Sequence, residues 1–136
     1  MTNVEVLRYL HKIDAYSCVS GGLTCLYVTL SRLLSSLDNF DLVRRLLDML
    51  EEDLTELYIC SQYLEMEGED EMLSKVRHII ALVEQVTYLL KKYLNREIGR
   101  EHIATKVEKL VRLVEQLRDD ARRRVEELRL LLPKLS

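Results

Sequence analysis

A chain of 136 residues, 48% hydrophobic and 32% charged, has the length of one domain and the composition of neither a disordered tail nor a membrane protein. Its net charge of −3, from 20 basic and 23 acidic residues, lacks the basic excess of a general nucleic-acid binder. One proline and four glycines are too few for the turns of a small β-sandwich or barrel, so we expect a single all-α domain over residues 1–136.

The first helix is expected over residues 3–37, where apolar side chains recur every three or four positions. Gly21-Gly22 lies in the middle of this segment and predicts either a kink or the close approach of another backbone. The uncharged run over 15–31 is slightly short for a membrane span and is diluted by Ser, Thr and Gly. We therefore expect a buried helix there and no membrane contact.

Three further helices are expected over residues 41–65, 70–95 and 100–132, each with a leucine- or valine-rich stripe at helical spacing. Gly68 is expected to stop the second helix, and Pro133 is expected to end the fourth. Each stripe needs neighbouring helices to bury it, and short connections make consecutive helices antiparallel. The sequence therefore predicts an up-down-up-down four-helix bundle in which the first and fourth helices are longer than the second and third.

The unequal helix lengths predict an apolar end. Both termini lie at the same end of this topology, so the surplus turns of the first and fourth helices should project there together. An uncovered apolar patch usually marks an interface, and the predicted interface residues are Leu7, Leu10, Leu128, Leu130, Leu131 and Leu132. A second candidate surface is the cluster of small side chains formed by Ser17, Ser20, Gly21 and Thr24.

The main functional interpretation is therefore a non-enzymatic assembly protein. Leucine-rich stripes would pack against a second copy, giving a homodimer, or against another protein, with flanking charges setting register. The alternative for the apolar end is burial of the same side chains within the chain.

An RNA-directed function is the second interpretation. The Arg and His of Arg96–His102 are separated by five residues, a spacing that resembles the Arg–His pair of the HEPN superfamily of helical RNases. This resemblance implies a nuclease or an RNA-binding helical module. Its nucleic-acid contacts would be Arg96, Arg100, His102, Arg118 and Arg122. Neighbouring acidic residues offer these arginines internal ion pairs, so nucleic-acid binding is not the favoured interpretation.

A magnesium site is the third interpretation. Asp53 and Glu56 are three residues apart on a helix, and the acidic segment 67–70 follows. This arrangement resembles the paired acidic motifs of all-α nucleotide pyrophosphohydrolases, whose carboxylates hold Mg²⁺ against a triphosphate. Helix caps and solvated helix faces explain the same residues, and no Gly-rich phosphate loop accompanies them. We expect no catalytic residue, no metal site and no cofactor.

The cysteine spacing and the low Asn and Gln content suggest the compartment and the source of the protein. Cys18 and Cys25 would share a helix face about 10 Å apart, too far to form a bridge within one helix. We therefore expect Cys18, Cys25 and Cys60 to be free buried thiols in a cytoplasmic protein. Asn and Gln are scarce beside many Arg and Glu residues, which indicates a thermophilic source.

Overall fold

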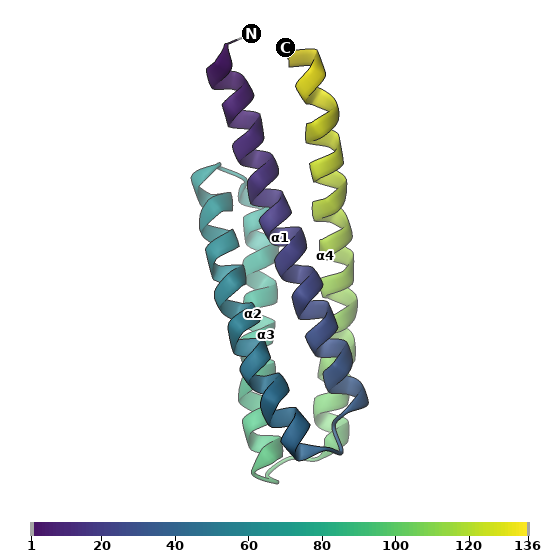
Figure 1. Ribbon diagram of the computed structural model, residues 1–136. Helices are drawn as coiled ribbons and strands as arrows, with labels where there is room; N and C mark the ends of the chain where they lie inside the picture. The colour runs from purple at the N-terminus through teal and green to yellow at the C-terminus, as the bar shows by residue number, and fades with distance from the viewer. Residues whose placement is uncertain (1, 136) are drawn as a thin grey trace.

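The computed structural model describes residues 2–135 of the chain, with side chains described up to residue 132. These residues form four helices and no strand: α1 (Asn3–Ser35), α2 (Phe40–Met66), α3 (Asp70–Leu94) and α4 (Arg100–Leu135). Each helix packs against its neighbours in the order α1–α2–α3–α4, and α4 closes the ring against α1 (Figure 1). The predicted antiparallel four-helix bundle is confirmed.

Local chemistry accounts for three of the helix ends. The Thr2 side chain accepts a hydrogen bond from the Glu5 N–H at 3.3 Å, and the Asn39 side chain accepts one from the Leu42 N–H at 3.2 Å. Both bonds satisfy donors that a helix N-terminus otherwise leaves unpaired. Gly68 follows the end of α2 with a φ of 67°, a left-handed conformation that costs glycine little.

One predicted boundary is wrong. Pro133 does not end α4, because the helix continues to Leu135. A proline removes a single N–H donor from the helical hydrogen-bond ladder. Near the C-terminus of a 36-residue helix, only the last turn depends on that bond.

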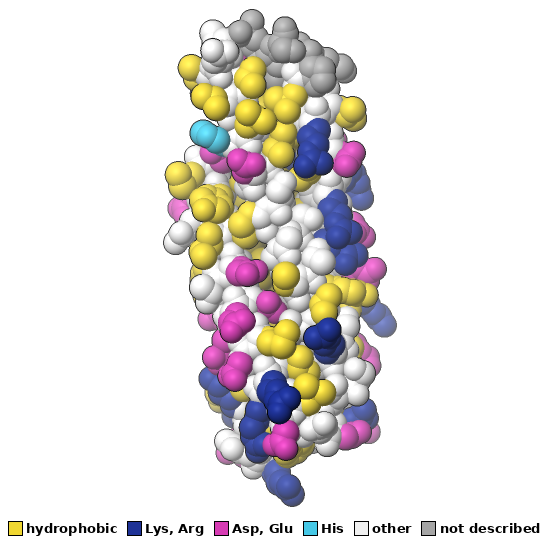
Figure 2. Space-filling view, viewed as in Figure 1, with side chains coloured by type: hydrophobic (Ala, Val, Ile, Leu, Met, Phe, Trp, Pro, Cys, Tyr) yellow, Lys and Arg dark blue, Asp and Glu magenta, His cyan; other side chains and the backbone are white. Residues whose placement is uncertain are grey.

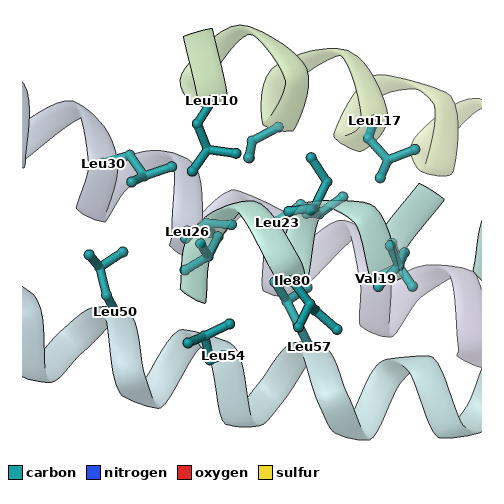
Figure 3. Packing of buried hydrophobic residues seen from close by; sticks show 14 of the residues in the cluster. Val19, Leu23, Leu26, Leu30, Leu50, Leu54, Leu57, Ile80, Leu110 and Leu117 are labelled. Atoms are coloured by element: carbon teal, nitrogen blue, oxygen red, sulfur yellow. The ribbon is translucent and has the colours of Figure 1, made fainter. Parts of the chain in front are cut away.

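The four apolar stripes meet in one continuous core. Figure 3 shows leucines of α1 and α2 pointing toward Ile80 of α3 and Leu110 and Leu117 of α4. Leu23, Leu26 and Leu30 of α1 are completely removed from solvent. Burying a leucine side chain stabilises the fold by about 1.5–3 kcal/mol, so these stripes explain why the helices associate.

The close contact between α1 and α2 explains why glycine occupies position 22, but not why it occupies position 21. A Cβ atom at Gly22 would lie 3.2 Å from Cδ2 of Leu57, whereas one at Gly21 would meet nothing within 4 Å. α1 is continuous through both glycines. What lies close to Gly22 is therefore the side chains of Leu57 and Cys60 rather than another backbone.

The expectation of three free buried thiols is wrong. Cys18 of α1 and Cys60 of α2 form a disulfide, with their Cα atoms 5.5 Å apart, and the remaining Cys25 is exposed. Spacing within one helix excludes a Cys18–Cys25 bridge, but it says nothing about pairing between helices. That pairing depends on how α1 and α2 are aligned, which only the packed structure shows.

α1 and α4 have 33 and 36 residues, against 27 in α2 and 25 in α3. Their surplus turns extend together past the α2–α3 connection, at the end that holds both termini (Figure 1). By length and composition α1 could also cross a membrane, a property that it shares with core helices of soluble bundles.

Candidate functional site

The most unusual surface is the projecting end, which we define as residues 3–10 of α1 and 128–135 of α4. Its lower limit on α1 is His11, whose Nδ1 lies 3.8 Å from Oε1 of Glu67 in the α2–α3 connection. Eight helical residues beyond that point span about 12 Å. In this part of the molecule α1 and α4 extend past α2 and α3, although Leu128 at its base is still part of the core.

Five apolar side chains of the projecting end are open to solvent, beside the exposed charged residues Glu5, Arg8 and Arg129. The exposed fraction is 51% for Leu7, 39% for Leu10, 70% for Leu130 and 36% for Leu131, and Val4 reaches 68%. Figure 2 shows apolar side chains gathered at this end. The structure therefore exposes four of the six residues predicted to form an interface.

Leu128 and Leu132 do not belong to that exposed set. Leu128 is 1% exposed, so it is part of the core, and Leu132 is partly buried against the core. Both continue the stripe that carries Leu117 and Val125 along α4. This spacing was a signal in the sequence that Leu128 and Leu132 face inward.

A polar cluster fixes the base of the projecting end. Glu69, beside the N-terminus of α3, accepts a 3.1 Å hydrogen bond from the Tyr16 hydroxyl and lies 3.7 Å from Nζ of Lys12. Burial, and then the Glu69 charge, raise the pKa of Tyr16 to about 12, so this phenol remains a donor at neutral pH. The cluster links the α2–α3 connection to α1. It marks the level beyond which α1 and α4 extend past α2 and α3.

The outward face of α1 continues downward from the projecting end. Between Lys12 and Arg32 its one charged residue is Asp14, and Ser17, Gly21 and Cys25 are exposed. Ser17 and Gly21 line an open groove of about 480 Å³ whose other wall includes Arg122 and Arg129 of α4. The small-residue cluster predicted from sequence is therefore a neutral surface beside an arginine-bearing edge.

The two sides of this α1 surface differ in charge, because carboxylates line the α2 side whereas the α4 side carries arginines together with Glu126 and Asp119. On the α4 side, the Arg118 guanidinium lies 4.9 Å from the Tyr27 ring centre, and Arg122 donates a 3.4 Å hydrogen bond to Oγ1 of Thr24. On the α2 side, Glu52, Asp53 and Glu56 follow the same length of α1. Figure 2 shows a largely neutral strip with acidic side chains on its left and both basic and acidic side chains on its right.

Acidic groups on the α2 side lie near enough to α1 to affect its side chains. Asp53 accepts a 2.8 Å hydrogen bond from the Thr29 hydroxyl, and burial raises the pKa of Asp53 despite that bond. Partial burial, followed by the charges of Glu56 and Asp53, raises the pKa of the Cys25 thiol. Cys25 is thus a thiol rather than an activated thiolate at neutral pH, which gives no support to nucleophilic chemistry.

The residues predicted to contact nucleic acid form two separate groups. Arg96 and Arg100 lie at the α3–α4 connection, where the Arg96 guanidinium is 5.6 Å from the Phe40 ring centre and Arg100 Nε is 3.3 Å from Asp38. His102 is exposed at the same end. Arg118 and Arg122 start sixteen residues further along α4, about 24 Å away. The two groups therefore lie on separate stretches of the bundle.

The carboxylates of the magnesium interpretation are also apart. Asp53 faces Thr29 of α1 in the middle of the bundle, whereas Glu67 and Glu69 lie at the α2–α3 connection. Fourteen helical residues from Asp53 to Glu67 correspond to about 21 Å. Among residues 2–135, no group of three or more His, Cys, Asp or Glu side chains is placed to hold a metal ion.

Comparison with protein-family models, with curated proteins and with solved structures finds no match to this chain. The surfaces described above are therefore what bears on function.

Proposed function

We propose that this chain is a non-enzymatic assembly protein that self-associates through the apolar projecting end. The observation that supports the proposal is the exposure of Leu7, Leu10, Leu130 and Leu131, where α1 and α4 extend past α2 and α3. Lower in the bundle, the stripes of α1 and α4 are buried by α2 and α3. At the projecting end, a second copy of the chain supplies the missing cover.

The apolar area of the projecting end limits how strongly two copies can bind through it. The exposed fractions of these four leucines add up to about two whole side chains per subunit. Complete burial of four leucine equivalents in a dimer corresponds to roughly 6–12 kcal/mol before costs. Association itself costs about 4–15 kcal/mol. The projecting end alone therefore supports a weak dimer, and additional contact area along the bundle is needed for a stable one.

Concentration-dependent sedimentation tests the proposal. We expect the unmodified chain to dimerise and the double variant Leu7→Glu/Leu131→Glu to sediment as a monomer with unchanged helix content, because it places charge in the contact. Leu113→Glu is the matched control, since Leu113 lies on the same helix as Leu131 and the two are 37% and 36% exposed. This control should dimerise normally.

Two results would contradict the proposal. One is a chain that remains monomeric at about 100 µM, well above the dissociation constant of a weak dimer. The other is a Leu7→Glu/Leu131→Glu variant that dimerises as strongly as the Leu113→Glu control.

A further inference from the structure

α1 has a face that its own bundle leaves uncovered. We define the α1 face by its outward-pointing residues, which are Leu7, Leu10, Ser17, Gly21, Cys25 and Val28. From Ser17 to Val28 every exposed residue of α1 is uncharged, whereas Asp14, between Leu10 and Ser17, is exposed and charged. Exposed helix faces in a protein with 32% charged residues normally carry many of those charges. The uncharged, exposed stretch from Ser17 to Val28 is suited to a helix–helix contact.

The charged residues on the two sides of the α1 face lie at similar positions along the α1 axis. Arg122 bonds to Thr24, and Arg118 stacks on Tyr27, so the basic side spans this stretch of α1. The acidic side spans the same stretch, because Asp53 bonds to Thr29 and the Glu56 charge acts on Cys25. Carboxylates thus lie on the α2 side of α1 and arginines at similar height on the α4 side, where Glu126 shares the groove with Arg122 and Asp119 pairs with Arg118.

Nearer the projecting end the same arrangement recurs. Asp14 lines a groove on the α2 side together with Tyr63 and Glu67. Arg129 lines the groove on the α4 side beside Ser17. Among the described residues, Arg129 forms no ion pair, and neither do Arg122, Glu52 and Glu56.

We infer that the α1 face is the contact between two copies of this chain, related by a twofold axis parallel to α1. The inference rests on the self-association proposed above and specifies its geometry. Rotation about such an axis preserves height and exchanges sides, so the acidic side of one copy meets the basic side of its partner. Glu52 and Glu56 then face the partner's Arg118 and Arg122, and Asp14 faces the partner's Arg129.

The opposite orientation fails on two counts. A twofold axis perpendicular to α1 would put acidic side against acidic side and basic against basic, which is repulsive. It would also send the two projecting ends to opposite ends of the dimer. The parallel arrangement brings them together, so Leu7 and Leu10 extend the same contact.

The contact area is adequate for a specific dimer. The 33 residues of α1 are about 50 Å long, and a helix with side chains is about 10–12 Å wide. α1 alone therefore offers roughly 500–600 Å² per subunit, and the bordering sides of α2 and α4 bring this near the ~800 Å² of standard interfaces.

Cross-linking at defined heights tests the geometry. In a Cys25→Ser background, which keeps the Cys18–Cys60 bridge, single cysteines are introduced as Leu10→Cys, Gly21→Cys or Val28→Cys and treated with a short bismaleimide. A parallel twofold dimer places each position opposite its own copy, so all three variants should form cross-linked dimers. Tyr88→Cys on α3 is the exposed control and should remain uncross-linked.

Charge exchange provides a second readout. Glu56→Arg should weaken dimerisation about threefold to tenfold, the range expected for ion pairs at an interface edge. Adding Arg122→Glu should restore it. Because Glu56 and Arg122 lie on opposite sides of α1, the restored attraction must act between chains.

The outcomes separate the two proposals. A chain that sediments as a monomer overturns self-association as a whole. A dimer that cross-links at one height only, or in which Arg122→Glu does not rescue Glu56→Arg, keeps self-association and overturns the parallel α1 contact. A monomer that floats with phosphatidylcholine vesicles would assign the α1 face to a membrane and overturn both.

Discussion

The disulfide between Cys18 and Cys60 gives the most quantitative prediction about this chain. The bridge closes a loop of 42 residues of sequence separation. Restricting the unfolded chain over a loop of that length stabilises the fold by about 4 kcal/mol. For a domain of this size each kcal/mol corresponds to roughly 3–4 °C in melting temperature. Breaking the bridge should therefore lower the melting temperature by about 12–16 °C.

The assay is thermal unfolding followed by far-ultraviolet circular dichroism, with and without a phosphine reductant. A Cys25→Ser background prevents exchange with the third, exposed cysteine. The variant Cys18→Ser/Cys60→Ser should melt at the temperature of the reduced chain and be insensitive to reductant. If alkylation of the unreduced, unfolded Cys25→Ser protein labels Cys18 and Cys60, or if reductant leaves the melting temperature unchanged, the reasoning is refuted.

Four further substitutions test helix stability and the buried polar groups. Gly21→Ala should stabilise the fold by about 1 kcal/mol because alanine favours the helix, and Gly22→Ala should give less because its Cβ would lie 3.2 Å from a leucine methyl group of α2. Asp53→Asn should stabilise the protein against urea at neutral pH. Burial raises the folded-state pKa of Asp53, so the stability linked to its proton is complete below the ordinary value of 3.8 and lost as pH rises through the folded value. The advantage of Asp53→Asn should therefore disappear at acidic pH. Tyr93→Phe should cost about 1–3 kcal/mol in the same assay, because it removes a buried 2.7 Å hydrogen bond to a main-chain carbonyl after α1.

The number, order and approximate ends of the helices could be predicted because leucine periodicity is a local signal. Residues such as Leu23, Leu57 and Leu110 repeat at helical spacing, and the structure buries all three. The exposed ends of α1 and α4 followed from helix lengths alone. Helix lengths place Leu128 in the exposed interface, whereas its position on the apolar stripe of α4 predicts burial. The structure buries Leu128, so its position on the stripe is the better guide.

Features that join different helices could not be predicted in this way. The Cys18–Cys60 bridge depends on the relative alignment of α1 and α2, which is set by packing at Gly22 and Leu57. The opposition of Glu56 and Arg122 across α1 likewise requires the positions of three helices at once. A one-dimensional pattern predicts the face on which a residue lies within its helix, but not what stands beside it in the bundle.

The mass of the native chain across a dilution series tests the central claim of self-association most directly. We predict a species of twice the 16.0 kDa chain mass at concentrations above its dissociation constant, separating into single chains on dilution. A mass of 16.0 kDa at every concentration would contradict the claim that the projecting end and the α1 face are contact surfaces between copies.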